Sequence, residues 1–214
     1  MPTPLVECVP NFSEGRDRAK IKRITDAIEA TSGVTLLNVE PGADTNRTVV
    51  TFVGSPSGVE QAAFSAIAMA AQVIDMRTHS GAHPRMGATD VCPFVPVEAI
   101  TMDDCAAIAR RLGERVGRDL GIPVYLYEAA ASRPERQNLA DVRRGEYEGL
   151  AKKLAEPAWK PDFGPAALNL ALQQEVGLTL PVQREIAREV AQAVAEGLGD
   201  EDLFAMEKYF NPCK

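Results

Sequence analysis

The chain has 214 residues, of which 23 are basic and 30 are acidic, so its formal net charge is −7 at pH 7. Hydrophobic residues make up 45% and charged residues 25%, a composition typical of a folded globular protein and not of a disordered segment. The acidic balance argues against nucleic acid or an anionic membrane as the main partner, because both bind basic surfaces.

The first half of the chain alternates between strand and helix patterns. In chain order, the predicted elements are a strand over Leu5–Val9, a helix over 17–33, strands over Val34–Glu40 and Arg47–Gly54, and a helix from Ser57 to Ile74. The turn-prone NFSEG follows the first strand as a loop, and PGADTN separates the other two strands, which therefore form a hairpin. Ser57 and Glu60 have the spacing of a capping box at the start of the second helix.

The second half begins with Asp75–Asp90, a stretch without periodicity. Beyond it the pattern predicts a strand over Val91–Val97, a helix capped by Thr101 and Asp104 that runs to Leu120, a strand over Pro123–Tyr127, and charged helical segments up to Glu156. The order β-α-β-β-α-β indicates a ferredoxin-like fold of the α/β class (an α+β sandwich), with a mixed sheet and helices packed on one face. We place a domain boundary near Pro165, so that residues 166–214 form a helical tail.

The loop Asp75–Asp90 carries the residues best suited to chemistry. A connection of this length inside a compact domain is usually functional, and it holds both histidines of the chain, His79 and His83. Their H-x3-H spacing is that of two helical zinc ligands, but Gly81 and Pro84 oppose a helix and no third ligand is evident, so we expect no metal. Two interpretations remain: the histidines hydrogen-bond within the loop, or one of them exchanges protons near neutral pH.

A second group of polar residues lies at the predicted strand ends. It consists of Asn11, Glu40, Thr45, Asn46 and Arg47, which a sandwich of this order brings towards the histidine loop. Glu40 is suited to orient a histidine or to hold a cationic substrate group, and Arg47 to clamp a carboxylate. Taken alone, Asn11 and Asn46 are ordinary turn residues, and Arg47 is of a type more often found as a solvated surface charge. No GxGxxG or GxxxxGK(S/T) loop is present, so we expect no nucleotide.

The spacing of the cysteines and the length of the apolar segments indicate in which compartment of the cell the protein is found. Cys8, Cys92, Cys105 and Cys213 form no CxxC pair, which favours reduced, buried thiols. The N-terminus has no basic leader followed by an apolar run, and the longest apolar stretch, AAFSAIAMAAQVI, is too short to span a bilayer. We therefore expect a cytoplasmic protein with no membrane partner.

Several longer motifs point to one family. The segments LVECVPNFSEG, TNRTVVTFVG, HPRMGATDVCPF, IPVYLYEAAA, RRGEYEGLAKKL and WKPDFGP together resemble the N-terminal subdomain of glutamate formiminotransferase, the partner of formiminotetrahydrofolate cyclodeaminase in a bifunctional animal protein. The resemblance covers Leu5 to Pro165 and identifies residues 1–165 as that subdomain. It implies transfer of the formimino group from N-formimino-L-glutamate to N5 of tetrahydrofolate, the cosubstrate, with release of L-glutamate in histidine degradation and one-carbon metabolism.

The resemblance also implies roles for individual residues. The family's catalytic histidine falls on the HPRMG motif, hence on His83, which would take a proton from N5 and return it to the departing nitrogen. The family's neighbouring carboxylate is an aspartate, and the residue in its position here is Glu40, one methylene longer. The residues implied to bind substrate or folate are Asn11, Arg47, His79, Arg85, Gly164 and Pro165, with Arg77 as a further cation for the substrate carboxylates.

The residues after Pro165 depart from the family pattern, which leaves three interpretations open. In the family a second subdomain completes the folate tunnel, and the sequence here contains no counterpart of it. The chain is therefore an active transferase, a noncatalytic folate- or glutamate-binding remnant, or one component of an enzyme completed by another chain. That other chain would be a homodimer mate, a separate second subdomain or a cyclodeaminase.

Overall fold

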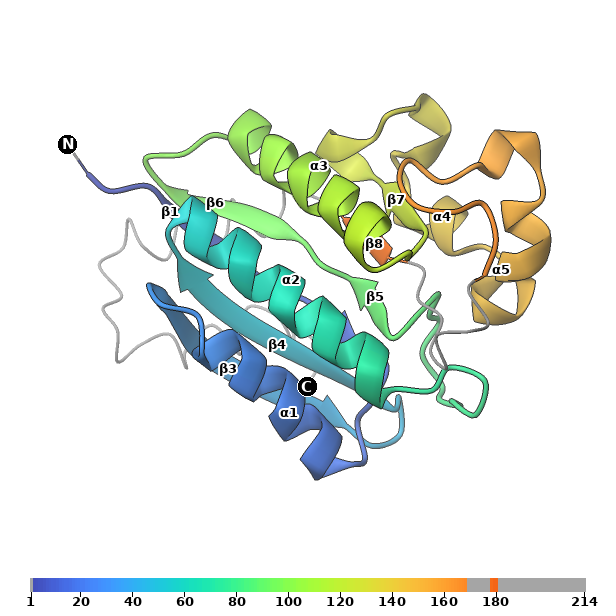
Figure 1. The fold of residues 1–214 in the computed structure, drawn as a ribbon, viewed down its shortest axis with the longest axis horizontal. Coiled ribbons are helices and arrows are strands. Elements are labelled where there is room, and N and C mark those ends of the chain that lie inside the picture. Colours follow the sequence, from blue (N-terminus) through green and yellow to red (C-terminus); the bar gives the residue numbers. More distant parts are fainter. Residues whose placement is uncertain (1, 169–177, 181–214) are drawn as a thin grey trace, which may run out of the picture.

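The computed structural model describes residues 2–168 and 178–180 (Figure 1). The strands are β1 Leu5–Cys8, β2 Asn11–Phe12, β3 Val34–Gly42, β4 Arg47–Gly54, β5 Thr89–Val91, β6 Phe94–Glu98, β7 Val124–Leu126 and β8 Leu178–Leu180. The helices are α1 Arg18–Glu29, α2 Pro56–Val73, α3 Met102–Asp119, α4 Leu139–Arg143 and α5 Glu146–Leu154. Short 3-10 helices are found at Glu128–Ala130, Pro134–Arg136 and Pro157–Trp159.

Strands β1, β3, β4 and β6 form the ferredoxin-like part of the sheet. β4 lies between β1 and β3, β6 borders the other edge of β1, and each neighbouring pair is antiparallel. The predicted hairpin is present as β3 and β4, in a register that pairs Glu40 with Val49. Both the β-α-β-β-α-β order and the ferredoxin-like arrangement are thus confirmed.

Two prolines interrupt neighbouring strands of this sheet. Pro10 separates β1 from β2, and Pro93 separates β5 from β6, because proline has no N–H to donate to a ladder. Hydrogen bonds still cross the breaks, from Val9 N to the Pro93 carbonyl at 3.2 Å and from Val50 N to the Pro10 carbonyl at 3.0 Å. The predicted single strand over Val91–Val97 is therefore two strands, and Asn11, expected in a loop, lies on β2.

Beyond β5 the sheet continues with parallel strands. β8 pairs with β5 on one side and with β7 on the other, which makes the sheet mixed, as predicted. β8 falls within the stretch where the sequence favours a helix. The remainder of the expected helical tail, residues 169–177 and 181–214, lies outside the described residues.

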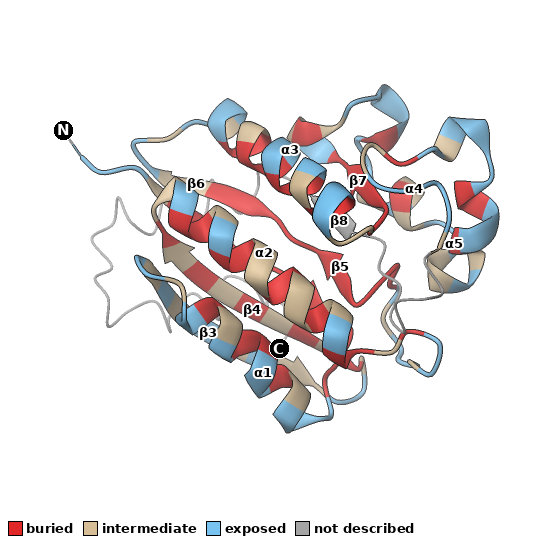
Figure 2. Ribbon diagram, in the orientation of Figure 1, coloured by how far each residue is buried: buried red, intermediate tan, exposed pale blue. Residues whose placement is uncertain are grey.

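Helices α1, α2 and α3 cover one face of the sheet, and the main core lies between these two layers (Figures 1 and 2). Alternate residues of the strands, such as Val6, Cys8 and Phe52, point into this core and are fully buried. Helix α2 presents a face of alanines to it, which lets the neighbouring helices approach closely. The layered arrangement leaves the loop after α2 at the end of the sheet, beside the turn between β3 and β4.

The helix starts are set by side-chain caps. Thr101 and Asp104 form the predicted capping box of α3, in which each side chain binds the other residue's backbone N–H. The predicted box at Ser57 is wrong, because α2 begins earlier: Ser55 Oγ accepts from Gly58 N at 3.2 Å, and Pro56 occupies the first helical turn. Proline favours that position, since its missing N–H needs no partner there.

A second apolar cluster joins α4 and α5 to strands β5 and β7. Its buried members are Met86, Val91, Tyr125, Tyr127, Val142, Leu150 and Leu154. Next to it, the carboxylate of Asp162 accepts from Arg136 NH1 at 2.6 Å and from Leu126 N at 2.8 Å. Arg136 is one of the largest fully buried side chains. The hydrogen bond from Leu126 fastens the segment after α5 to β7, and the ion pair fastens it to the 3-10 helix Pro134–Arg136.

Glu7 on β1 is a buried carboxyl group whose protonation is expected to make the stability of the fold depend on pH. Val6 and Cys8 face the main core, so Glu7 points to the opposite face of the sheet, where it is 6% exposed and its Oε2 has no partner among the described residues. Burial raises the pKa of Glu7 from its ordinary 4.5 to about 7.

The Glu7→Gln variant should therefore be more stable than the wild type above pH 7 and similar to it below pH 4.5. Because the folded state binds the Glu7 proton more tightly, the free energy of unfolding falls by about 3 kcal/mol as pH rises through that window. Urea unfolding at both pH values measures the effect. Parallel pH dependences of the two proteins would show that Glu7 does not titrate in this way.

Candidate active site

The loop between α2 and β5, residues 75–88, is held in place by backbone contacts with two other loops. The Ser13 hydroxyl donates to the Gly87 carbonyl at 2.7 Å, and Ala82 N donates to the Asp44 carbonyl at 3.3 Å. Gly81 lies so close to the β3–β4 turn that a Cβ atom there would be 2.2 Å from the Thr45 carbonyl oxygen. The glycine of HSGAHP is therefore needed for the loop to dock.

His83 faces Arg47, the first residue of β4. The Nε2 atom of His83 lies 2.8 Å from Arg47 NH1, and its Nδ1 lies 2.6 Å from the Pro84 carbonyl oxygen. A carbonyl only accepts and a guanidinium only donates, so Nδ1 carries the proton and Nε2 keeps its lone pair. Burial, then the charge of Arg47, lowers the pKa of His83. The half-buried imidazole is thus a neutral base whose basic nitrogen points at Arg47.

His79 is held in the opposite tautomer. Its Nδ1 accepts from Arg85 Nε at 3.2 Å, and its Nε2 donates to the Asn46 carbonyl at 2.9 Å. Burial lowers the pKa of His79, which keeps the ring neutral near pH 7. These two hydrogen bonds tie the histidine loop to the β3–β4 turn and to Arg85, which gives His79 an orienting role.

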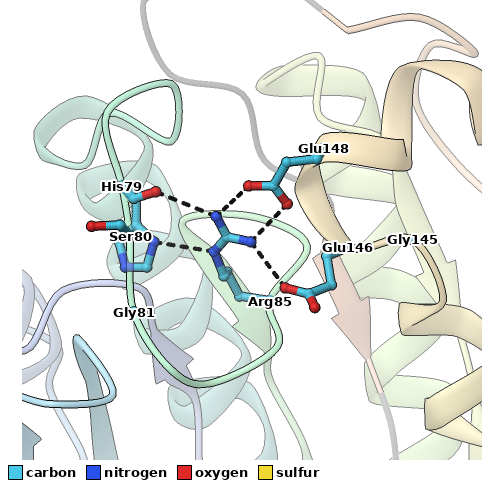
Figure 3. A pocket seen from close by; sticks show the side chains of 7 residues that line it. All are labelled: His79, Ser80, Gly81, Arg85, Gly145, Glu146 and Glu148. Atoms are coloured by element: carbon cyan, nitrogen blue, oxygen red, sulfur yellow. Dashed lines mark hydrogen bonds and ion pairs between the residues drawn. The ribbon is translucent and has the colours of Figure 1, made fainter.

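Arg85 joins this loop to helix α5. Its guanidinium donates to both carboxylate oxygens of Glu148, at 2.6 and 2.8 Å, and to Glu146 at 3.0 Å (Figure 3). These ion pairs raise the pKa of Arg85, and its side chain is 8% exposed. The three charged groups line an open hollow of about 440 Å³ together with His79, Ser80, Gly81 and Gly145. Because its charge is balanced within the chain, Arg85 is not free to bind an anion unless these glutamates move.

The two groups of residues singled out in the sequence do meet. His79 binds the backbone of Asn46, and the adjacent Arg47 binds His83. The Asn46 side chain completes the junction, donating to the Ser80 carbonyl at 3.0 Å and accepting from Gly15 N at 2.9 Å. The end of the β3–β4 hairpin therefore supports the histidine loop, as the topology predicts.

The other predicted site residues are not joined to His83 by any described contact. Asn11 is buried in β2, where its Nδ2 donates to the Val9 carbonyl at 3.0 Å. Glu40 is exposed on β3 and makes no side-chain hydrogen bond or ion pair with a described residue. Arg77 forms a bidentate pair with Asp75 in its own turn.

Gly164 and Pro165 lie next to β7 and α3. Gly164 has φ +80° and sits against the backbone of Ile122, where a Cβ atom would be 2.1 Å from the carbonyl oxygen. Pro165 is exposed. The glycine of DFGP is required by this turn, and no described contact brings the pair to the histidine loop.

Asp90 and Arg143 belong to the site although their residue types alone do not single them out. Asp90 is 1% exposed and accepts from Met86 N at 2.8 Å, while its other oxygen pairs with Arg143 NH2. Asp90 ends the histidine loop, and Arg143 lies in the RRGEYEG segment, which reads simply as a charged helical stretch. Only the tertiary fold, which packs α4 beside β5, brings the two residues together.

Within residues 2–168 and 178–180, no three His, Cys, Asp or Glu side chains are grouped so that they could hold a metal ion. None of the helices in this part of the chain is long and apolar enough to cross a membrane. Cys8, Cys92 and Cys105 are buried free thiols, as expected, and the expectation for Cys213 lies outside the described residues.

A family model, the N-terminal subdomain of the formiminotransferase domain, matches residues 5–181. The chain belongs to this family. The formimidoyltransferase-cyclodeaminase of Dictyostelium discoideum is 54% identical over 162 residues, which are 76% of this chain and 30% of that protein. The glutamate formimidoyltransferase of Streptococcus pyogenes serotype M1 is 48% identical over 179 residues, 83% of this chain and 60% of that protein. That of Thermoplasma acidophilum is 51% identical over 175 residues, 81% of this chain and 58% of that protein.

This formiminotransferase subdomain therefore spans less than two thirds of each of these relatives, and less than a third of the bifunctional one. The relatives share a name for one reaction, formimidoyl transfer. The histidine loop, the β3–β4 hairpin and the RRGEYEG segment all lie within the matched residues 5–181.

Proposed function

We propose that the chain transfers the formimino group of N-formimino-L-glutamate to N5 of tetrahydrofolate and releases L-glutamate. The observation that carries the proposal is the neutral His83, whose lone pair at Nε2 lies 2.8 Å from the Arg47 guanidinium. A base next to a carboxylate-binding cation suits a substrate whose reacting nitrogen is close to a carboxylate.

His83 serves as both base and acid in this reaction. The N5 amine attacks the amidine carbon to form a tetrahedral intermediate, and His83 Nε2 takes the N5 proton. The bond from that carbon to the glutamate nitrogen then breaks, and the same proton passes to this nitrogen. No proton is gained or lost overall, so one imidazole with a pKa near or below neutrality is sufficient.

Arg47 binds a carboxylate of the donor substrate in this scheme. When the carboxylate neutralises the guanidinium, the charge that lowers the pKa of His83 is offset, and Nε2 becomes a stronger base once substrate is bound. Glu40 faces the incoming amidinium, and Asn11, Gly164 and Pro165 belong to the folate-binding surface, as the family resemblance implies. His79 and Arg85 hold the loop that carries His83.

The assignment of a cytoplasmic location and of further partners is part of the same proposal. Cys8 Sγ and Cys92 Sγ lie 3.5 Å apart as free thiols, which suits a reducing compartment. A second subdomain, a cyclodeaminase chain or a second copy of this chain would supply the remaining wall of the folate site. The name of the Dictyostelium discoideum relative joins the two activities in one protein, which supports a cyclodeaminase as the partner.

Incubation of the purified chain with N-formimino-L-glutamate and tetrahydrofolate should yield 5-formiminotetrahydrofolate and L-glutamate in equal amounts. Chromatography of both products measures the reaction. If the chain binds tetrahydrofolate in calorimetry but gives no product, it is a binding remnant. If product forms only after a separately produced second subdomain is added, the chain is one component of a two-chain enzyme.

A further inference from the structure

Arg143, the last residue of α4, is a partly buried cation with no role assigned so far. Its NH2 group pairs with the carboxylate of Asp90, and its side chain is 17% exposed. Asp90 in turn accepts from the backbone N–H of Met86 in the histidine loop. The Arg143 guanidinium is therefore linked to the histidine loop through Asp90.

In the part of the chain that the structure describes, positive charge exceeds negative charge around His83. Arg47 donates a hydrogen bond to His83. The charge of Arg143 lowers the pKa of both residues, and the carboxylate of Asp90 opposes this by raising the pKa of both. Among the described residues, the guanidinium groups of Arg47 and Arg143 thus stand against the carboxylate of Asp90 beside a neutral imidazole. A half-buried site with such an excess of positive charge is stabilised by a bound anion.

Arg143 also has hydrogen-bonding capacity to spare. Its NH2 is bonded to Asp90, its Nε is buried without a partner among the described residues, and none of them bonds to its NH1. The hydroxyl of Tyr127 is likewise buried without a described partner. Burial raises the pKa of Tyr127, and the charge of Arg143 opposes that rise. Buried polar groups are nearly always paired, so Arg143 and Tyr127 have hydrogen-bond donors available for a further acceptor.

We propose that Arg143, together with Arg47, binds the α-carboxylate of the donor substrate beside His83. The inference rests on the function proposed above and assigns a residue to it. In N-formimino-L-glutamate the α-carboxylate is attached to the carbon that bears the reacting nitrogen. When that nitrogen reaches Nε2 of His83, the carboxylate comes within reach of Arg47, whose NH1 is 2.8 Å from the same Nε2. Two guanidinium groups suit the two oxygens of one carboxylate.

Calorimetric titration of the full chain with L-glutamate tests this site without turnover. The Arg143→Lys variant keeps a cation for Asp90 but loses the spare guanidinium nitrogens, so its affinity for L-glutamate should fall at least about tenfold. γ-Aminobutyrate lacks the α-carboxylate, so the variant should bind it as the wild type does. The matched control is Arg144→Lys, a change in the next residue, whose side chain is 77% exposed. Equal affinity of Arg143→Lys and the wild type for L-glutamate would overturn the proposal.

Nuclear magnetic resonance of the wild-type protein provides a second test, which does not require any variant to fold correctly. The chain has only two histidines, so its Cε1–H resonances report His79 and His83 separately. Saturation with L-glutamate should raise the pKa of His83, because the carboxylate offsets the charges of Arg47 and Arg143, and should leave that of His79 nearly unchanged. A pKa of His83 that does not respond to L-glutamate would contradict the proposed site.

The two tests separate this inference from the proposed reaction. If the chain binds L-glutamate through Arg143 but transfers no formimino group, the carboxylate site stands and the reaction is withdrawn. If the chain is active and Arg143→Lys leaves the KM for N-formimino-L-glutamate unchanged, the reaction stands and Arg143 is only a structural partner of Asp90.

Discussion

Replacement of His83 by alanine should lower the rate of formimino transfer by about 10²–10⁴-fold, the range that general acid–base groups contribute. His83 is half-buried, and its side-chain hydrogen bonds within the described residues are those to Arg47 and to the neighbouring Pro84 carbonyl, so the variant should keep the fold. The loss should appear mainly in kcat, because the imidazole acts on protons that move only during the reaction. Steady-state kinetics with both substrates measures it.

The pH dependence of the wild type provides the matching control. Because the pKa of His83 lies below its ordinary value of about 6.5, the basic form prevails at pH 7 and kcat/KM should fall only as pH drops through the lowered pKa. In His83→Ala the residual activity should lack that acidic limb. Transfer that persists at the wild-type rate in the variant would rule out His83 as the proton carrier.

The second large effect is expected on stability. Replacement of Arg136 by methionine should lower the free energy of unfolding by about 3–5 kcal/mol, since it leaves Asp162 without its ionic partner. Arg136 is 1% exposed and Asp162 8%, and the same carboxylate binds the β7 backbone. Urea unfolding followed by circular dichroism measures the change.

An exposed ion pair of the same chemistry is the control for that measurement. Arg111 pairs with Glu60 between α3 and α2, and its side chain is 54% exposed. Arg111→Met should therefore change the stability by less than about 1 kcal/mol, as is usual for surface pairs. If both variants lost the same small amount, the buried pair would contribute no more than an exposed one.

Much of the fold could be predicted from the spacing of apolar and turn residues, because those patterns reflect local geometry. Local signals, which depend only on residues close together in the sequence, were sufficient for the isoleucine face of α1, the turn PGADTN and the capping box of Thr101 and Asp104. Two of the errors arose where proline overrides the local pattern. Pro56 moved the start of α2 to Ser55, and Pro93 divided a strand that reads as continuous.

The candidate site was only partly predictable, since its geometry depends on contacts between distant segments. The contact between Arg47 and His83 follows from the hairpin and the long loop, both visible in the sequence. The balanced charge of Arg85 does not, because it depends on glutamates of α5 that read as solvated surface charge. The position of Arg143 beside Asp90 likewise depends on how α4 packs.

The clamp between Arg85 and Glu148 has a consequence for the order in which the protein folds. It joins residues 63 positions apart, and the contacts of His79 and His83 with the β3–β4 hairpin span 33 and 36 positions. Contacts between distant positions form late, since the intervening chain must first lose its freedom. A nascent chain can therefore complete its first hairpin and helices well before the histidines are aligned. The fixing of Arg85, which hydrogen-bonds to His79, waits for α5, which comes near the end of the continuous described segment.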